Sequence, residues 1–248
     1  MARYKITLAY DGTQFFGMQR QASERTVQAE VETALRKLGW QDQSILAAGR
    51  TDRGVHASGQ VIAFDLDWAH PDGKLRDALN ANLPSDLAVR QVEEANEDFH
   101  PRFDARWRQY EYRLLCQSWP NPLLERYVWR LWPEVDITEM NTACLFLRGE
   151  HDFAAFGTPP KEGGSTSRNV LKAAWARENE QELRFTIRAN GFLYHMVRRM
   201  VGMLVKVGQG LLESSDVEQV LSKKELIQDL APAQGLTLVG VGYAEKTE

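Results

Sequence analysis

The sequence predicts an α+β protein with largely antiparallel sheets that carry helices on one side. Residues 4–10 alternate between apolar and polar side chains, which is the period of a half-buried strand. Residues 192–207 have the apolar spacing of a long helix, and Gly208 follows where a helix would end. Between these two segments, strand and helix patterns follow one another in an order typical of antiparallel sheets.

In the first half, the clearest helix pattern begins after Thr26 and ends before Gly39. Thr26 has the side chain of an N-cap, and Gly39 stands where a C-cap glycine belongs. Asp11 and Gly12 predict a turn after the first strand. The other elements expected here are strands at about 45–49, 59–67 and 87–93, and a helix at about 73–81.

In the second half, Tyr110 and Tyr112 alternate with Glu111 and Arg113, which predicts a strand with one aromatic face. The Gly/Pro/Ser/Thr-rich stretch 157–167 predicts a loop. The remaining expected elements are helices at 138–147 and 216–221, an antiparallel strand pair at 170–177 and 183–189, and a last strand at 236–241. The sequence thus predicts two domains, 1–105 and 106–248.

Composition is typical of a soluble globular protein, with 43% hydrophobic and 26% charged residues. No apolar run approaches the roughly 20 residues of a membrane helix. The first residues run directly into a strand pattern, so no signal peptide is expected, and the two cysteines, Cys116 and Cys144, have no metal-ligand spacing. The expected compartment is the cytoplasm.

The formal net charge of −4 argues against indiscriminate nucleic-acid binding. The arginines are nevertheless grouped, as in the pairs Arg50/Arg53 and Arg198/Arg199, whereas the acids gather elsewhere. A basic cleft on an acidic body therefore remains compatible with the sequence.

Residues 49–56, with the sequence Gly-Arg-Thr-Asp-Arg-Gly-Val-His, are the most informative segment. They place one carboxylate, Asp52, between Arg50 and Arg53, in a turn bounded by glycines and flanked by two expected strands. Taken alone, the segment favours a tight turn with a weak surface ion pair. A loop between strands can also hold an acidic group in a fixed pose over a cleft.

Two further segments carry chemistry that fits such a cleft. The strand with Tyr110 offers a flat ring on which a base can stack. At about 100° per residue, one stripe of the expected helix 192–207 carries His195, Arg198, Arg199 and Gly202. Because neighbouring guanidinium groups favour a charged carboxylate, Asp52 is expected to be ionised at neutral pH. Asp52 then suits a nucleophile or an electrostatic role better than a general acid.

Together these segments resemble the tRNA pseudouridine synthase I family (TruA). The resemblance extends over almost the whole chain, because further blocks match in order. They are Tyr10-Asp11-Gly12 with Phe16-Gly17 and Gln19-Arg20-Gln21, Asn80 to Pro84, Asp98 to Phe103, Arg108 to Tyr112, Gly149 to Phe153, His195 to Arg198 with Val201-Gly202, and Pro232 to Leu236 with Leu238-Val239.

The resemblance implies isomerisation of uridine to pseudouridine at positions 38, 39 and 40, in the anticodon stem-loop of tRNA. It implies the pseudouridine synthase fold, with two ferredoxin-like halves and a catalytic cleft between them. It also implies a homodimer that needs no metal and no organic cofactor. By matching position, Asp52 is the nucleophile, Tyr110 stacks on the target base and Arg198 pairs with Asp52. Arg50, His195 and Arg53 are candidate substrate contacts.

Two positions depart from the family pattern. Arg53 follows the aspartate where the family usually has a small residue, and we expect it to add an RNA contact rather than to crowd the pocket. Met18 stands where the family commonly has Trp, and we expect it only to alter packing. Neither departure removes a catalytic group.

Three alternatives are open at this stage. A non-catalytic RNA-binding protein would use the tyrosines for stacking but gives Asp52 no purpose. A glycoside hydrolase needs a second carboxylate, for which Asp104, Glu111 or Asp152 are candidates. A metal site is not favoured, because the histidines at 56, 100, 151 and 195 lie far apart without a ligand pattern.

Overall fold

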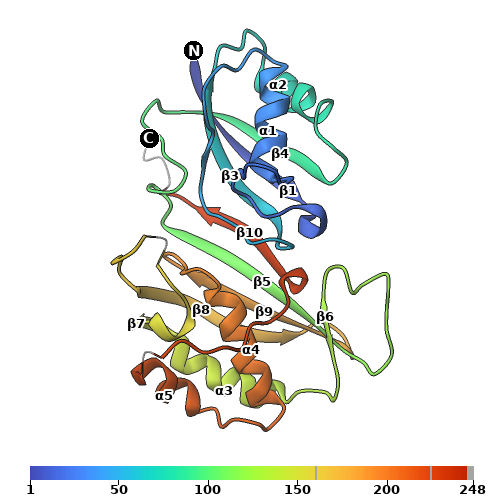
Figure 1. Cartoon of the computed structure of the whole chain (residues 1–248), viewed down its shortest axis with the longest axis vertical. Helices are drawn as coiled ribbons and strands as arrows, with labels where there is room; N and C mark the ends of the chain where they lie inside the picture. Colours follow the sequence, from blue (N-terminus) through green and yellow to red (C-terminus); the bar gives the residue numbers. More distant parts are fainter. Residues whose placement is uncertain (160, 224, 245–248) are drawn as a thin grey trace. The chain divides into compact units, whose positions relative to one another are not determined.

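The structure is a computed structural model that describes residues 1–159, 161–223 and 225–244. The chain divides into two compact units (Figure 1). Unit 1 comprises Met1–Arg106 and Leu238–Glu248, and unit 2 comprises Trp107–Thr237. The last strand, β10 (Leu236–Gly242), therefore contributes its residues from Leu238 onward to unit 1.

Unit 1 packs two helices on an antiparallel sheet with the strand order β4-β1-β3. Its elements are β1 (Ala2–Tyr10), η1 (Gly12–Gln14), α1 (Val27–Arg36), β2 (Leu46–Ala47), β3 (His56–Leu66), α2 (Asp72–Asn80) and β4 (Leu87–Ala95). The apolar positions of β1 that the alternation marked, such as Ile6 and Leu8, are fully buried. Ile6 lies opposite Ile62 of β3 and Val92 of β4, so the alternation sets the register of the sheet.

The helix signals of unit 1 are confirmed. Thr26 caps α1, since its hydroxyl accepts a hydrogen bond from the Ala29 N–H at 3.4 Å. Gly39, just beyond the helix, has the positive φ of 93° that a non-glycine residue rarely adopts.

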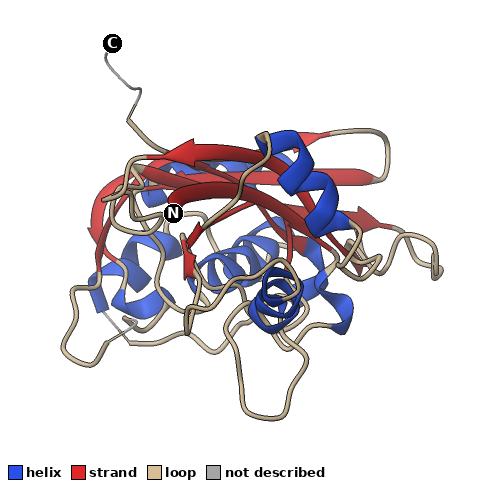
Figure 2. Ribbon diagram, turned by 90° about the horizontal axis from the view of Figure 1, so that it is seen from above, coloured by secondary structure: helices blue, strands red, loops and turns tan. Residues whose placement is uncertain are grey.

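Unit 2 has a sheet with the order β5-β9-β8-β7, in which every neighbouring pair is antiparallel, and the short strand β6 is parallel to β5. Helices α3 and α4 lie on one face of this sheet (Figures 1 and 2). The elements are β5 (Trp107–Cys116), β6 (Trp129–Leu131), α3 (Ile137–Leu147), β7 (Gly149–Asp152), η2 (Ala154–Phe156), β8 (Ser167–Arg177), β9 (Glu182–Ala189), α4 (Met196–Gly208), α5 (Asp216–Lys223) and η3 (Ala233–Gly235).

Alternation along the strands separates the two faces of this sheet. On the helix side, Tyr112, Phe185 and Ile187 are fully buried. On the other side, the strands present polar and charged side chains, among them Arg184 and Arg188. The α+β class and the largely antiparallel sheets expected from the sequence are confirmed.

The prediction that the long helix begins at Phe192 is wrong, because α4 begins at Met196. The Tyr194 N–H donates to the Thr158 carbonyl at 2.9 Å instead of closing a helical turn. His195 then has a φ of 64° and a ψ of 2°, in the left-handed region. The four residues before α4 are therefore not helical, although their apolar side chains continue the spacing of the helix.

The two cysteines are both buried and unpaired by disulfide. No helix within the described ranges is long and apolar enough to cross a membrane.

Candidate active site

Residues 49–56, hereafter the Asp52 loop, connect β2 to β3 in unit 1. Main-chain bonds fasten this loop to residues 10–18. The Met18 N–H donates to the Thr51 carbonyl at 3.0 Å, and the Gly54 N–H donates to the Phe15 carbonyl at 3.3 Å. The turn itself closes through the Val55 N–H and the Asp52 carbonyl, at 3.1 Å. The backbone on both sides of Asp52 is therefore fixed by hydrogen bonds.

A buried side-chain bond reinforces the same connection. The Tyr10 hydroxyl lies 2.8 Å from the Thr51 hydroxyl. Burial raises the pKa of Tyr10 to about 12, so its phenol keeps its proton at neutral pH. A second contact lies at the end of the loop, where the Gly12 N–H donates to Nδ1 of His56 at 3.0 Å. The residue before Asp52 and the end of its loop are both tied to the segment that follows β1.

Two glycines permit this close approach. A Cβ at Gly12 would lie 2.1 Å from the Val55 carbonyl oxygen, so any side chain there would clash with the backbone of the loop. Gly17 has a φ of 96°, and a Cβ there would lie 2.7 Å from the Thr51 carbonyl oxygen. The motif that contains Tyr10-Asp11-Gly12 and Phe16-Gly17 thus forms the support of the Asp52 loop.

The two arginines of the loop differ in their surroundings. Both are exposed, but the Arg53 guanidinium also lies 4.1 Å from the centroid of the Phe16 ring. This distance is that of a cation–π contact, so Arg53 extends over an aromatic ring of its own unit. Met18 is 1% exposed and packs in the core of unit 1.

In unit 2, Tyr110 lies on the helix side of β5, opposite Ile187 of β9. Its ring contacts Phe192 edge to face, with the two centroids 5.1 Å apart and the planes at 90°. Phe192 is the fourth residue before α4 begins, so this contact brings Tyr110 close to the segment that leads into α4.

Tyr112, two residues further along the same face, has a structural role that the sequence did not assign. Its hydroxyl donates to the Pro232 carbonyl at 2.8 Å, and burial raises its pKa well above the usual value. A Cβ at Gly235 would lie 2.5 Å from the Tyr112 ring. The Pro232–Gly235 block, which the sequence identified only as a motif, therefore closes over Tyr112.

The polar stripe of α4 faces residues 227–231. Arg198 and Ala231 are joined twice, because the Arg198 Nε donates to the Ala231 carbonyl at 2.8 Å and the Ala231 N–H donates to the Arg198 carbonyl at 3.1 Å. The Arg199 Nε donates to the Ile227 carbonyl at 3.0 Å. A Cβ at Gly202 would lie 3.0 Å from the Asp229 carbonyl oxygen, which confirms that this glycine admits another backbone.

His195 is not part of that stripe, contrary to the sequence analysis. It occupies the N-cap position of α4 in a left-handed conformation, and its ring stacks on Tyr194 with the centroids 3.7 Å apart. Sequence periodicity could not find this, because the period of 3.6 residues assumes that the helix has already begun.

The predicted site residues thus form two sets. Arg50, Asp52 and Arg53 share one loop of unit 1, and Tyr110, His195 and Arg198 belong to unit 2, around Phe192 and the start of α4.

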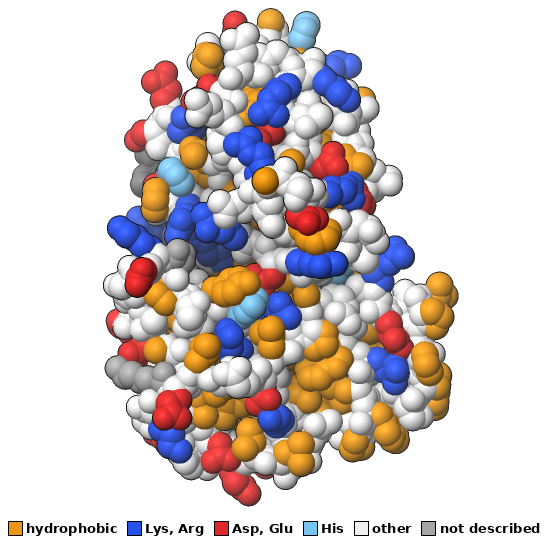
Figure 3. All heavy atoms as spheres, viewed as in Figure 1, with side chains coloured by type: hydrophobic (Ala, Val, Ile, Leu, Met, Phe, Trp, Pro, Cys, Tyr) orange, Lys and Arg blue, Asp and Glu red, His pale blue; other side chains and the backbone are white. Residues whose placement is uncertain are grey.

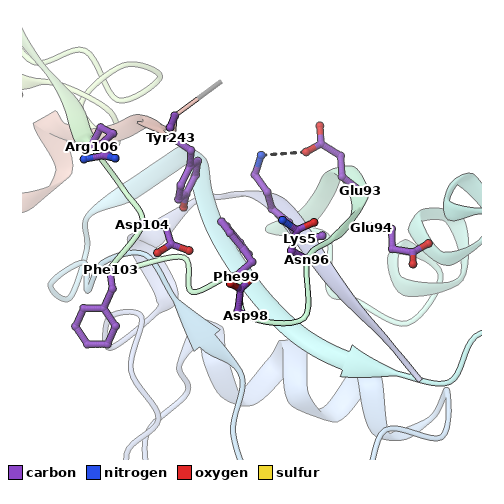
Figure 4. A pocket seen from close by; sticks show the side chains of 12 residues that line it. Lys5, Glu93, Glu94, Asn96, Asp98, Phe99, Phe103, Asp104, Arg106 and Tyr243 are labelled. Atoms are coloured by element: carbon purple, nitrogen blue, oxygen red, sulfur yellow. Dashed lines mark hydrogen bonds and ion pairs between the residues drawn. The ribbon is translucent and has the colours of Figure 1, made fainter. Parts of the chain in front are cut away.

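A cavity of about 660 Å³ in unit 1 does not suit an RNA site (Figure 4). Lys5, one of its two basic residues, pairs with Glu93 at 3.0 Å. Its lining also includes the acids Glu94, Asp98 and Asp104. A phosphate entering this cavity would meet an excess of negative charge.

The alternative chemistries find little support. Within the described ranges, no three His, Cys, Asp or Glu side chains are grouped so that they could hold a metal ion. The carboxylates that a glycosidase would need are engaged locally. Asp104 accepts from the His100 N–H at 2.8 Å, and Asp152 accepts from the Ala154 N–H at 3.1 Å.

Comparison with known proteins resolves the family. The model of the tRNA pseudouridine synthase family matches residues 6–104 and 143–244, which include Asp52, His195 and Arg198. A tRNA pseudouridine synthase A of Limosilactobacillus fermentum is 41% identical, over 98% of this chain and 96% of its own. Tyr110 lies between the two segments matched by the family model.

Other relatives are similar to this chain over nearly its whole length. One of the same name from Listeria welshimeri is 40% identical over 98% of this chain and all of its own, and one from Citrifermentans bemidjiense is 38% identical over the full length of both. A solved Cbf5-Nop10-Gar1 complex gives a TM-score of 0.35 at 11% identity, over 82% of this chain and 45% of that one, a likeness too weak to define a fold. The resemblance found in the sequence motifs is confirmed, and the chain belongs to the tRNA pseudouridine synthase family.

Proposed function

We propose that this protein isomerises uridine to pseudouridine in tRNA, at positions 38, 39 and 40 of the anticodon stem-loop, with Asp52 as the nucleophile. The observation that carries the proposal is the full-length similarity to relatives named tRNA pseudouridine synthase A. The fastening of the Asp52 loop supports the role of its carboxylate, because a nucleophile must be held in a near-attack position.

The reaction is an isomerisation and needs no external reactant. The bond between N1 of the uracil and C1′ of the ribose breaks, and the uracil turns. C5 then bonds to C1′ and loses its proton, while N1 gains one. An ionised aspartate suits three routes: attack at C1′, attack at C6 of the base, or removal of a proton from C2′ to give a glycal.

The residues of unit 2 have complementary roles in this proposal. The target nucleotide must leave the base stack before it can react. Tyr110 stacks on the uracil, and its edge-to-face contact with Phe192 holds the ring for that purpose. Arg198 pairs with the Asp52 carboxylate, while its Nε remains bonded to the Ala231 carbonyl and fixes its direction. Arg50, Arg53 and His195 contact the RNA.

The remaining features of the proposal follow the family. The protein acts as a homodimer in the cytoplasm, without metal and without an organic cofactor. A non-catalytic RNA-binding protein is the alternative, but it gives no reason for a loop so firmly held around a carboxylate.

The direct test uses tRNA that carries tritium at C5 of uridine. The purified protein, with chelator present and no added cofactor, should release tritium to solvent from an unmodified tRNA with uridine at position 38, 39 or 40. Mapping of the product should locate pseudouridine at those positions. Absence of release from all three substrates would refute the proposal.

A further inference from the structure

The sheet of unit 2 has a polar face on the side opposite α3 and α4. Successive residues of a strand point to opposite faces, so the residues beside Tyr110 point away from the helices. On this outer face, Gln109 of β5, Arg188 of β9 and Lys172 of β8 lie side by side in register. Trp107 is two residues before Gln109 and shares the face. The helix-bearing face, by contrast, shows broad hydrophobic areas among its charges (Figure 3).

At one end of the outer face the cations are neutralised. The Arg184 guanidinium lies 2.8 Å from Glu178 and 3.5 Å from Glu111. Arg113 forms an ion pair with Glu182, with Nη2 2.5 Å from the carboxylate. Each positive side chain at this end therefore has a carboxylate beside it.

The other end is different. Lys172 and Arg188 are opposite one another, although both are positive. Arg188 donates from Nε and Nη2 to the Gln109 side-chain carbonyl at 2.9 and 2.6 Å, and its guanidinium lies 4.2 Å from the Trp107 ring centroid. Within the described part of the chain, neither cation forms an ion pair with a carboxylate.

This arrangement leaves donors available. A guanidinium has five N–H groups in a fixed plane, and Gln109 takes up two of them. The contacts with Gln109 and Trp107 also hold the plane still, which lowers the entropy cost of binding an anion. Two adjacent like charges without a counterion favour an anionic partner.

We propose that Trp107, Gln109, Lys172 and Arg188, here called the outer patch, bind the sugar-phosphate backbone of tRNA. Arg188 binds one phosphate through its free N–H groups, Lys172 neutralises the next, and Trp107 supports the guanidinium. The inference rests on the proposed function, which supplies the RNA. The neutral amide and two cations suit a polyanion better than a second copy of this chain, since a symmetric interface built on this patch would bring like charges from both copies together.

The outer patch contacts a part of the tRNA distant from the target uridine. Gln109 and Tyr110 are adjacent in β5 and point to opposite faces of the sheet. A phosphate on Arg188 is thus separated from a base stacked on Tyr110 by the sheet itself. The contact therefore belongs to full-length tRNA and not to an isolated anticodon stem-loop.

The test measures the Kd for full-length tRNA at several salt concentrations between about 50 and 200 mM. The variants are Lys172→Gln, Arg188→Gln and the double variant. Lys172 is exposed, so its substitution leaves folding intact; unfolding temperatures check the others. The matched control is Arg177→Gln, which removes the same charge from β8 at a position paired with Glu134 at 3.0 Å.

The double variant should weaken binding roughly tenfold at low salt and lower the slope of log K against log salt by about 1.5 to 2, as expected for two lost phosphate contacts. Arg177→Gln should leave both values unchanged within about twofold. An unchanged slope in the folded double variant would overturn the inference, as would equal losses with a stem-loop RNA. Failure of the proposed function can be told apart from failure of this inference. If the proposed function were wrong, the wild-type protein would release no tritium.

Discussion

The two units hold their proposed catalytic residues by different means. In unit 1, the Asp52 loop is fixed mainly by main-chain bonds and by glycines that let two backbones touch. In unit 2, α4 is fixed to residues 227–231 by two guanidinium groups that donate to main-chain carbonyls, beside one main-chain bond and the close approach at Gly202. Backbone contact tolerates almost no change in volume, whereas a side-chain donor can be exchanged at moderate cost. Substitution of a glycine under the Asp52 loop should therefore cost more than substitution of a guanidinium group of α4.

Gly12→Ala should have the largest effect on the free energy of unfolding. The added Cβ would lie 2.1 Å from the Val55 carbonyl oxygen, so the loop must move. We expect a loss of about 3 kcal/mol or more, with activity reduced at least a hundredfold. Urea denaturation and tritium release measure the two. In the control Gly73→Ala, the new Cβ meets nothing within 4 Å, and stability should be unchanged or slightly raised.

Tyr10→Phe should affect activity more than stability. Loss of the 2.8 Å bond to Thr51 frees the residue before the nucleophile, so kcat should fall about tenfold while KM stays within twofold. Thr51→Val should give a similar or smaller loss, because the Tyr10 hydroxyl also bonds to the Gln60 side chain. The double variant should be no worse than Tyr10→Phe, which by itself removes the bond to Thr51.

Tyr4→Phe is the control for this series. It removes a hydroxyl from the same strand, and no side-chain hydrogen bond of Tyr4 is found among the described residues. Equal effects of Tyr4→Phe and Tyr10→Phe on kcat would show that the bond to Thr51 does not position Asp52.

Arg199→Ala should have a moderate effect on unit 2. It removes the bond from Nε to the Ile227 carbonyl and should lower the free energy of unfolding by about 1–2 kcal/mol. Hydrogen exchange should rise in residues 227–231 without rising in the Asp52 loop. Faster exchange in both segments would contradict the claim that the Asp52 loop and residues 227–231 are held independently of each other.

Acid should produce the smallest and most gradual change. Hydrogen bonding to Arg25 lowers the pKa of Asp86, and Arg3 does the same for Asp65. A carboxyl whose pKa is lower in the folded than in the unfolded chain stabilises the fold above its ordinary pKa of about 4. That contribution is lost as the pH falls through the lowered value. Stability should therefore be level from pH 7 to 5 and decline below 4.

Arg25→Gln should make this acid decline shallower, as measured by urea denaturation between pH 5 and 3. Arg76→Gln is the matched control, since its pair with Asp77 is exposed on both sides. If Arg25→Gln and the wild type lost the same free energy over this range, the pair with Asp86 would not be the source of the pH dependence.

The sequence predicted most elements because their signals are local. Thr26, Gly39 and the alternation around Ile6 each act within a few residues, and each is confirmed. The start of α4 could not be predicted, since Tyr194 is held by a bond to Thr158, far away in the chain. The short strands β6 and β7 depend similarly on distant partners.

The candidate site was predictable only in part. Asp52 stood out through its motif, but the bond from Tyr10 to Thr51 joins residues far apart in sequence, and no local pattern announces it. Nor could spacing reveal that Arg53 lies over Phe16 or that Tyr112 is enclosed by Pro232 and Gly235. Such contacts depend on the folding of distant segments against each other.

The central claim is that the Asp52 loop is held as it is in order to present a nucleophile. The most direct measurement compares tritium release by wild type and Asp52→Asn from the same labelled tRNA, with the Kd for tRNA measured in parallel. The amide keeps the size of the side chain and removes its charge. We predict that release falls below detection in Asp52→Asn while the Kd stays within about threefold or tightens. Release at an undiminished rate by the folded variant would contradict the claim.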